Sequence, residues 1–261
     1  NVLFLTNKMS TYKMKIYNSF INSIGGNAHT ELFIYHCNES LFLNLLEKSQ
    51  GAYDYYLVMP HFKSTQLKHR SYSEAIIQGI NSIPKGKLII MDNNKIVLKG
   101  DYGEVYQDFE NDIYHALNKG MGKIVGYKKL LLVYPEKAEY PYPKRIVFGF
   151  RKFCAEHGID FEIIDEIYDD IILKKGDLFI TIEESDLVSL VKQVREDNLE
   201  VGKDIGIISY NDTLLKEIVE GGITTISTDF KMMGTQLAQM ITNKETNKIE
   251  NPSDLILRKS L

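Results

Sequence analysis

The sequence predicts an α/β protein with two lobes, each built around a doubly wound parallel sheet. Short β-rich runs alternate with amphipathic helical patterns along nearly all of the 261 residues. Continuous apolar strands between amphipathic helices are typical of parallel sheets that helices cover on both faces. A chain with 44% hydrophobic and 25% charged residues is an ordinary globular one. Its length suits two lobes of about 100–150 residues each.

The apolar runs predict strands whose spacing defines two units. The predicted strands are residues 2–5, 32–35, 55–59, 88–91, 130–133, 161–164, 178–182, 205–209 and 223–226. The first unit runs from Val2 to about Val125, and the second starts at Lys129. No linker rich in Pro, Gly or Ser separates them, which fits lobes that several strands tie together.

Helical periodicity lies between these strands. Met14, Tyr17, Ile21 and Ile24 recur at three- and four-residue steps and stop at a glycine pair, which is a helix terminator. Further helical patterns cover residues 105–117 before Gly120, 147–154 before Gly158, and 187–194.

Composition argues against a disulfide framework, a membrane span and a broad nucleic-acid surface. The net charge of −4 and the pI of about 5.9 give no basic excess. Cys37 and Cys154 have no C-x-x-C spacing, so two reduced thiols are the simplest interpretation and a single bridge is the alternative. No apolar run approaches the roughly 18 residues of a membrane span. The abrupt start at a strand-like run predicts that a signal peptide or another domain preceded it.

Catalytic and cofactor motifs find no match. The turn after the first strand, residues 6–11, contains no glycine, unlike the phosphate-binding turn of α/β enzymes. Gly120, Gly122 and Gly126 approach the dinucleotide fingerprint, but they follow a helix instead of a strand. The six histidines show no metal-ligand spacing. We therefore expect neither an enzyme nor a cofactor or metal site.

Three segments of the last third carry a family pattern. Residues 204–212 read DIGIISYND, residues 222–234 read GITTISTDFKMMG, and residues 255–261 read LILRKSL. In this order and at these intervals they resemble the lactose/galactose-repressor (LacI/GalR) family of transcription regulators. Its regulatory domains carry P-D-(I/V)-x-(I/V)-x-G-(F/Y)-D-(D/N), L-T-T-(I/V) and G-x-x-A, and end near L-(I/V)-x-R-x-S.

A looser resemblance covers nearly the whole chain, through residues 53–59, 101–103, 144–150 and 184–186. Ser209 stands where the family has glycine, and Asn211 where it has the first acid. One extra residue before Gly149 makes Lys144 and Arg145 rivals for the family's arginine. These departures resemble gluconate-repressor-type (GntR) regulators, in which a winged-helix DNA-binding domain precedes the sensor.

The resemblance implies a periplasmic-binding-protein-like fold of type I, with three crossovers between the lobes and a saccharide in the cleft. The expected lobes are residues 1–126 with 229–245, and residues 127–228 with 246–261. In open α/β sheets the ligand lies outside the carboxyl ends of the strands. A sugar that touches both lobes is expected to favour the closed state by a hinge motion and thereby change DNA binding.

Asn211 is the principal candidate contact, because it follows the strand at 205–209 and takes the place of the family's sugar-binding acid. Its alternative role is a turn residue or a helix N-cap, and Asp212 is the better cap candidate. A sugar needs amides or carboxylates, a bidentate guanidinium and an aromatic platform.

The remaining candidates each have a competing structural role. Arg145 is a hydroxyl clamp or a solvated helix start, Phe230 a cleft residue or hinge packing, and Ser185 a hydroxyl contact or an N-cap. Asp101 matches a first-lobe sugar contact of the family. The topology adds residues from two turns at strand carboxyl ends: Ser10, Tyr12, His61 and Phe62.

The expected partners follow from this interpretation. They are a small sugar, with a pentose or deoxyhexose such as arabinose or fucose as the family-level expectation, and operator DNA held by an upstream domain. A homodimer is expected, with the helix that carries Ser73, Ile76, Ile77 and Ile80 as its first-lobe interface. A cytoplasmic location is expected. The alternatives are a periplasmic or lipoprotein sugar-binding protein of a transporter and an α/β enzyme.

Overall fold

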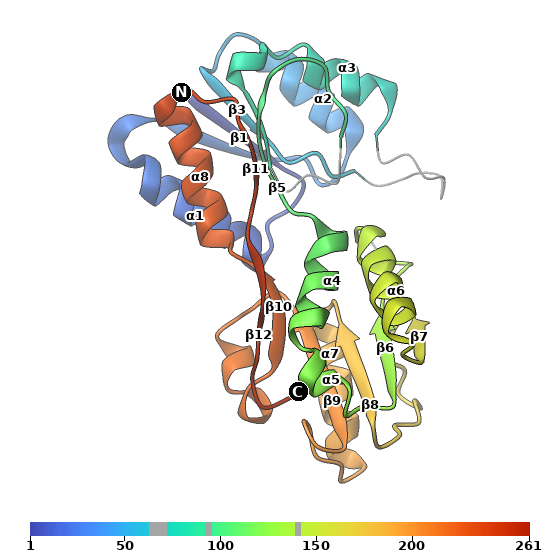
Figure 1. The fold of residues 1–261 in the computed structure, drawn as a ribbon. Helices are drawn as coiled ribbons and strands as arrows, with labels where there is room; N and C mark the ends of the chain where they lie inside the picture. The colour runs from blue at the N-terminus through green and yellow to red at the C-terminus, as the bar shows by residue number, and fades with distance from the viewer. Residues whose placement is uncertain (63–71, 92–95, 139–141) are drawn as a thin grey trace. The chain divides into compact units, whose positions relative to one another are not determined.

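The computed structural model describes residues 1–62, 72–91, 96–138 and 142–261. The chain divides into two compact units, and both are discontinuous in sequence (Figure 1). Unit 1 comprises residues 1–107 and 229–252, and unit 2 comprises residues 108–228 and 253–261. The predicted fold class is confirmed: each unit contains a sheet dominated by parallel strands, and the chain passes between the units three times. Within the described residues, no helix combines the length and the apolar character of a membrane span.

Unit 1 holds a six-stranded sheet in the order β11-β5-β4-β3-β1-β2, with all pairs parallel. Its strands are β1 (Val2–Thr6), β2 (Thr30–Ile34), β3 (Tyr55–Val58), β4 (Leu88–Met91), β5 (Gly103–Tyr106) and β11 (Lys248–Glu250). Its helices are α1 (Thr11–Ile24), α2 (Glu39–Lys48), α3 (Glu74–Asn81) and α8 (Phe230–Asn243), with short 3-10 helices at Gly25–Asn27 and Lys85–Lys87. One apolar cluster joins α1 and α8 to the sheet, and another joins α2 and α3 to it.

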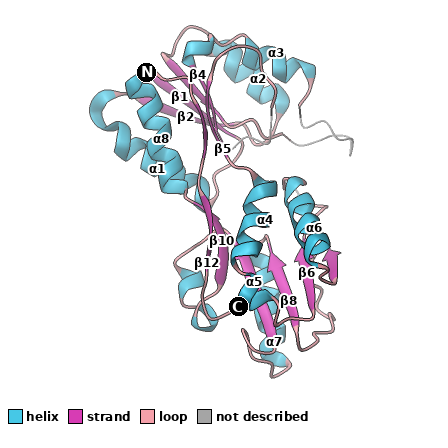
Figure 2. Ribbon diagram, viewed as in Figure 1, coloured by secondary structure: helices cyan, strands magenta, loops and turns pink. Residues whose placement is uncertain are grey.

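Unit 2 repeats this plan in the order β12-β10-β9-β8-β6-β7, with β12 alone antiparallel. Its strands are β6 (Lys129–Val133), β7 (Phe161–Ile164), β8 (Asp177–Thr181), β9 (Ile205–Tyr210), β10 (Thr224–Thr228) and β12 (Ser253–Ile256). Its helices are α4 (Phe109–Lys119), α5 (Met121–Ile124), α6 (Arg145–His157) and α7 (Glu184–Glu196), with 3-10 helices η3 (Leu215–Glu217) and η4 (Val219–Gly221). In Figure 2 helices lie on both sides of the strands of unit 1, with α1 and α8 on one side and α2 and α3 on the other.

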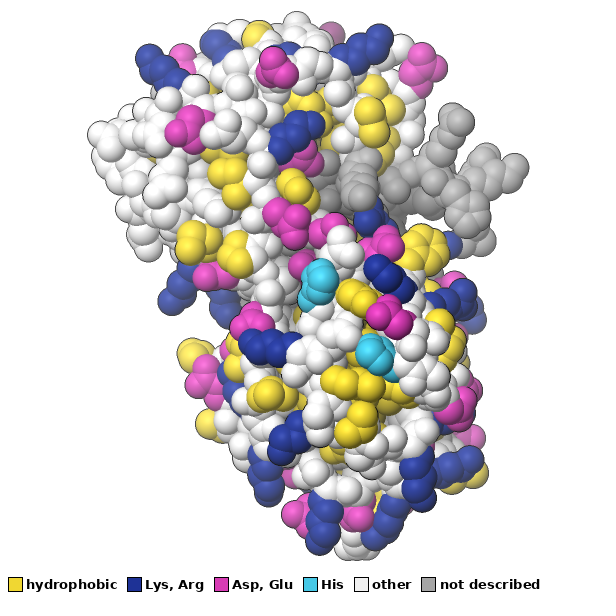
Figure 3. Space-filling model, in the orientation of Figure 1, with side chains coloured by type: hydrophobic (Ala, Val, Ile, Leu, Met, Phe, Trp, Pro, Cys, Tyr) yellow, Lys and Arg dark blue, Asp and Glu magenta, His cyan; other side chains and the backbone are white. Residues whose placement is uncertain are grey.

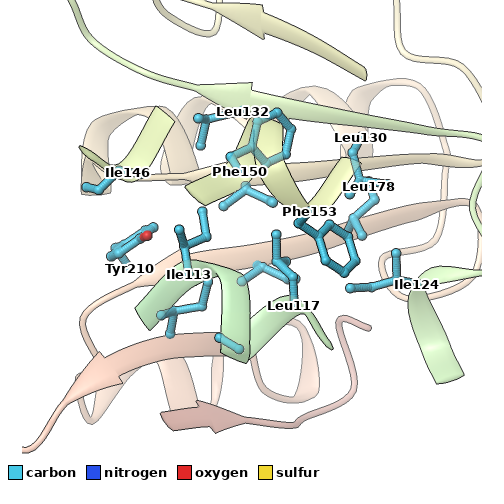
Figure 4. Close-up of a cluster of buried hydrophobic side chains, with 14 of the residues drawn as sticks. Ile113, Leu117, Ile124, Leu130, Leu132, Ile146, Phe150, Phe153, Leu178 and Tyr210 are labelled. Atoms are coloured by element: carbon cyan, nitrogen blue, oxygen red, sulfur yellow. The ribbon is translucent and has the colours of Figure 1, made fainter. Parts of the chain in front are cut away.

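The core of unit 2 shows how the amphipathic helices predicted from the sequence pack against each other and on the sheet. Phe150 and Phe153 on α6 meet Ile113 and Leu117 on α4, in one cluster with sheet residues such as Leu130 and Leu132 (Figure 4). Cys154 lies in the same cluster, and burial raises the pKa of its thiol to about 12. Both cysteines are free and buried.

Three strands and one helix boundary differ from the prediction. The sequence assigned Val105 to a helix, but Val105 lies on β5, and α4 begins at Phe109 after the N-cap Asp108. The side chain of Asp108 accepts from the backbone N–H of Asn111, which ends the strand and starts the helix. The prediction also omitted β11 and β12, because both are short and rich in polar residues.

The unit boundaries also differ from the expected lobes. Residues 108–126 lie in unit 2 because α4 packs on α6 and β12, and residues 246–252 lie in unit 1 because β11 pairs with β5. Of the residues expected at the dimer face of α3, Ile76 and Ile80 are fully buried in the core of unit 1 itself, whereas Ser73 and Ile77 are half-buried.

Two glycines allow helices to touch backbone to backbone. A methyl group at Gly149 on α6 would collide with the carbonyl oxygen of Glu110 on α4. A methyl group at Gly234 on α8 would collide with the carbonyl oxygen of Ile16 on α1. Both glycines fall within the family pattern found in the sequence, and close helix contact is the reason for them.

We predict that Gly234→Ala lowers the free energy of unfolding by about 1–3 kcal/mol, because the added methyl forces α1 and α8 apart. Gly122→Ala is the control, since a methyl there meets no atom within 4 Å. Chemical denaturation measures both variants. Equal stability of Gly234→Ala and the unaltered chain would contradict the packing.

Candidate functional site

In each unit, candidate site residues lie in the loops that follow the parallel strands. In unit 2, Tyr134, Ile182 and Asn211 directly follow β6, β8 and β9. Because the carboxyl ends of parallel strands meet at one edge of a sheet, these loops share that edge. The start of α6 at Arg145 belongs to the connection that leaves β6 at the same edge.

Asn211 follows β9 in the left-handed backbone region, with φ of 62°. Asparagine tolerates this region better than most residues. Its backbone N–H donates to the carbonyl oxygen of Ile226 at 2.9 Å. Its half-buried side chain makes no hydrogen bond with another side chain or backbone group in the described part of the chain. The amide is therefore held in place by its backbone and keeps its donors and acceptor for another molecule.

Asp212 has a structural role that the sequence did not predict. Its carboxylate accepts two hydrogen bonds from the guanidinium of Arg258, at 2.6 and 2.9 Å, and one from Thr225 Oγ1 at 3.1 Å. The hydrogen bond to Asp212 raises the pKa of Arg258. The cap role expected for Asp212 is wrong, because the following 3-10 helix has Leu214 as its N-cap. The sequence feature that could have indicated this role is Arg258, the arginine of the LILRKSL segment. Its guanidinium binds Asp212 in the loop after β9.

Arg145 is the first residue of α6 and is engaged by α4 and its N-cap. Its Nη2 lies 3.1 Å from Glu110 Oε2 and 3.4 Å from Asp108 Oδ1. Its Nε is buried and has no hydrogen-bond partner among the described residues. The rival Lys144 is exposed. The two acids thus orient a guanidinium that retains one buried donor, which favours Arg145 over Lys144 as a ligand contact.

Ser185 lies in the first turn of α7, where its hydroxyl donates to Glu183 Oε2 at 3.2 Å. Glu183 is the N-cap residue, so the cap alternative for Ser185 is wrong. Burial, with the negative charge of Glu183 as the second cause, raises the pKa of Tyr142. The phenol of Tyr142 is protonated at neutral pH, as an ordinary tyrosine is, and a side-chain hydrogen bond with Glu183 is a further cause of its raised pKa.

At the carboxyl edge of the unit 1 sheet, Asn7 follows β1 and is buried with Lys13 of α1. The ammonium of Lys13 donates to Asn7 Oδ1, and Asn7 Nδ2 donates to Cys37 Sγ at 3.1 Å. Ser10 is the N-cap residue of α1, yet its hydroxyl makes no capping bond. The Ser10 hydroxyl is buried without a hydrogen-bond partner in the described ranges.

The aromatic candidates of unit 1 pack inside that unit. The rings of Tyr12 and Phe230 stack with centroids 4.8 Å apart, and Phe230 is only 5% exposed in the core. Phe62 packs between Tyr35 and Phe42, with centroids 5.1 and 5.0 Å away. Tyr12 is the most open of these rings, so it is the best placed to offer an apolar face.

His61 and Asp101 lie at opposite edges of the unit 1 sheet. The backbone N–H of His61 donates to the hydroxyl of Tyr35 at 2.8 Å, so the turn after β3 is fixed by the residue after β2. Asp101 precedes β5 and is exposed at the amino edge of the sheet, because β5 runs parallel to β4. The structure therefore brings Ser10, Tyr12 and His61 to one edge of unit 1 and leaves Asp101 at the other.

The geometry contains a polar edge in each unit. Among the residues that the structure describes, no three His, Cys, Asp or Glu side chains are grouped to hold a metal ion.

Residues 122–261 match the family model for the periplasmic binding protein-like domain. The match covers more than half of the chain.

The chain belongs to the periplasmic binding protein-like domain family.

One relative of this periplasmic binding protein-like chain is a transcriptional regulator by name. The HTH-type transcriptional regulator CelR of Thermobifida fusca is 23% identical over 144 residues, which are 54% of this chain. The match spans 39% of the length of CelR.

Solved structures show the same fold over the full chain. A LacI family transcriptional regulator from Silicibacter pomeroyi has a TM-score of 0.77 and 13% identity, over 100% of this chain and 98% of that one. Another from Lactobacillus casei, with bound glucose, has a TM-score of 0.76 and 9% identity, over 100% of this chain and 99% of that one.

We predict that Asp186→Asn stabilises this periplasmic binding protein-like chain at pH 7. Burial raises the pKa of Asp186, and the negative charges of Glu183, Glu166 and Asp165 raise it further. Folding therefore disfavours the charged form, and this cost is present above the folded pKa and lost as the pH falls below the ordinary aspartate value. The substitution keeps an acceptor, because an amide oxygen can still accept from the N–H of Ile167, which lies 2.9 Å from Asp186 Oδ1.

Thermal unfolding at pH 7 and at about pH 3 measures this effect. We expect a higher Tm for Asp186→Asn at pH 7 and a smaller difference at the acidic pH, where the aspartate is largely protonated in both states. Asp169→Asn, at an exposed position of the same unit, is the control. The same Tm difference at both pH values would contradict the prediction.

Proposed function

We propose that this chain is the effector-binding domain of a bacterial transcriptional regulator and that its effector is a small sugar. The strongest support is the carboxyl edge of unit 2 in a chain of this family. There Asn211, Tyr142 and Ser185 offer uncharged donors and acceptors, and Arg145 offers a buried N–H. Sugar hydroxyls both donate and accept, so such a set suits them better than it suits a phosphate.

The relatives support the two halves of this proposal. CelR is named as a regulator with a helix-turn-helix. The Lactobacillus casei regulator was solved with glucose bound and also with sucrose bound. We propose that Ser10, Tyr12 and His61 of unit 1 complete the contacts that Asn211 begins.

The mechanism we propose is a population shift. A sugar that contacts both units binds one arrangement of them more tightly, and only this difference in affinity moves the equilibrium. In this proposal a separate domain binds operator DNA. The suggestion that this domain is a winged helix rests only on the departures of the sequence from the LacI/GalR pattern. The net charge of −4 agrees with this division, and basic and acidic side chains are interspersed on the face shown in Figure 3.

We predict that a thermal-shift screen identifies one sugar that raises the Tm. A ligand at about 100 times its Kd stabilises the folded chain by about 2.7 kcal/mol. The panel is glucose, sucrose, arabinose, fucose, their phosphorylated forms and nucleotides. Stabilisation by nucleotides alone would contradict the proposal.

Two variants make the screen specific. Asn211→Ala is expected to remove most of the shift produced by the stabilising sugar, because it deletes the amide. Asp101→Ala is the matched control, since Asp101 lies at the opposite edge of the unit 1 sheet. Equal shifts in the two variants would remove Asn211 from the site.

We also propose that the chain forms a homodimer, since a regulator that reads two matched half-sites needs a two-fold pair. Leu214, Leu215 and Ile218 offer an exposed aliphatic surface for it. We predict a dimer at micromolar concentration in sedimentation velocity and its dissociation by Leu215→Asp. A monomer of the unaltered chain at that concentration would contradict the dimer.

A further inference from the structure

The segment after β9 has its polar and apolar side chains reversed. Lys216 is 3% exposed, whereas Leu214, Leu215 and Ile218 are 81%, 69% and 72% exposed. Lysine is among the residues least often fully buried, and an ammonium loses hydration when it leaves water. A specific set of contacts must therefore hold Lys216 inside unit 2.

Those contacts surround Asn211. Lys216 Nζ donates to the carbonyl oxygen of Tyr210 at 2.6 Å and to the carbonyl oxygen of Asn211 at 2.9 Å. These two carbonyls belong to the two peptide groups on either side of the Asn211 Cα. Fixing both groups fixes φ and ψ of Asn211.

The backbone of Lys216 is fixed in turn. Its carbonyl oxygen accepts from the N–H of Ile223, next to the start of β10, at 2.7 Å. The N–H of Asn211 is bound to Ile226 on β10. The side chain and the backbone of Lys216 together thus tie the loop after β9 to the strand beside it.

Asn211 has a backbone conformation that its surroundings help to define. Its φ of 62° lies in the left-handed region, which asparagine tolerates better than other residues with a Cβ but which is still less common than the right-handed one. Conformations of this kind persist where the surroundings determine them, and they gather at functional sites.

We propose that Lys216 is a positioning residue of the effector site, which holds Asn211 left-handed so that its amide is presented in one orientation. This inference rests on the proposed function, in which Asn211 contacts the sugar. Lys216 itself does not contact the sugar and acts through Asn211.

The first test needs no ligand. In Lys216→Met the stem is kept and the ammonium is removed, so the backbone chemical shifts of Asn211 are expected to lose their left-handed values. Lys203→Met, at a lysine whose side chain is 73% exposed in the same unit, is the control and is expected to leave them unchanged. Left-handed shifts retained in Lys216→Met overturn the proposal.

The second test measures the affinity for glucose and for sucrose by calorimetry. Lys216→Met is expected to weaken binding at least about tenfold, and Lys216→Arg to restore part of it. In an Asn211→Ala background Lys216→Met is expected to cause no further loss, because the two residues act in series. Additive losses overturn the proposal.

Two outcomes separate this inference from the proposed function. If neither sugar binds the unaltered chain, these sugars fail as effectors, and the chemical shifts of Asn211 alone decide whether Lys216 holds the loop. If Lys216→Met does not fold, Lys216→Gln, which keeps a donor group of shorter reach, replaces it in both tests.

Discussion

Hydrogen bonds around Asn251 join the three segments in which the chain passes between its units. The backbone N–H of Asn251 donates to the carbonyl oxygen of Tyr106 at 2.8 Å, and its Nδ2 donates to the carbonyl oxygen of Asp229 at 2.9 Å. The N–H of Asp229 donates to the carbonyl oxygen of Pro252 at 2.9 Å. All of these residues belong to unit 1, so the bonds join the three segments of that unit at which the chain leaves it or returns to it.

Much of the fold was predictable, because buried parallel strands and amphipathic helices leave a strong pattern. The strands that were missed, β5, β11 and β12, are short and contain charged residues. β11 pairs with β5 and β12 with β10 only after the chain has crossed between the units, which a local pattern does not record. The crossings between the units are also the reason why α4 lies in unit 2 and not in the expected first lobe.

The candidate site was predictable at the level of loops and less so at the level of side chains. The order of strands and the family pattern pointed to Asn211, whereas Lys216 and Arg258 gain their roles only from contacts in the folded chain. From the sequence, a lysine beside two leucines is expected to be solvated while the leucines are buried. In the structure Lys216 is buried, and Leu214 and Leu215 are exposed. Phe62 and Phe230 lie in the core because each ring has aromatic neighbours in its own unit.

The glycine contacts between helices have a mechanical consequence. At Gly149 and Gly234 the main chains of paired helices meet without an intervening layer of side chains. Such pairs have no rotamers to exchange and little room to slide, since protein interiors have low compressibility. These two helix pairs are therefore stiff where their main chains meet.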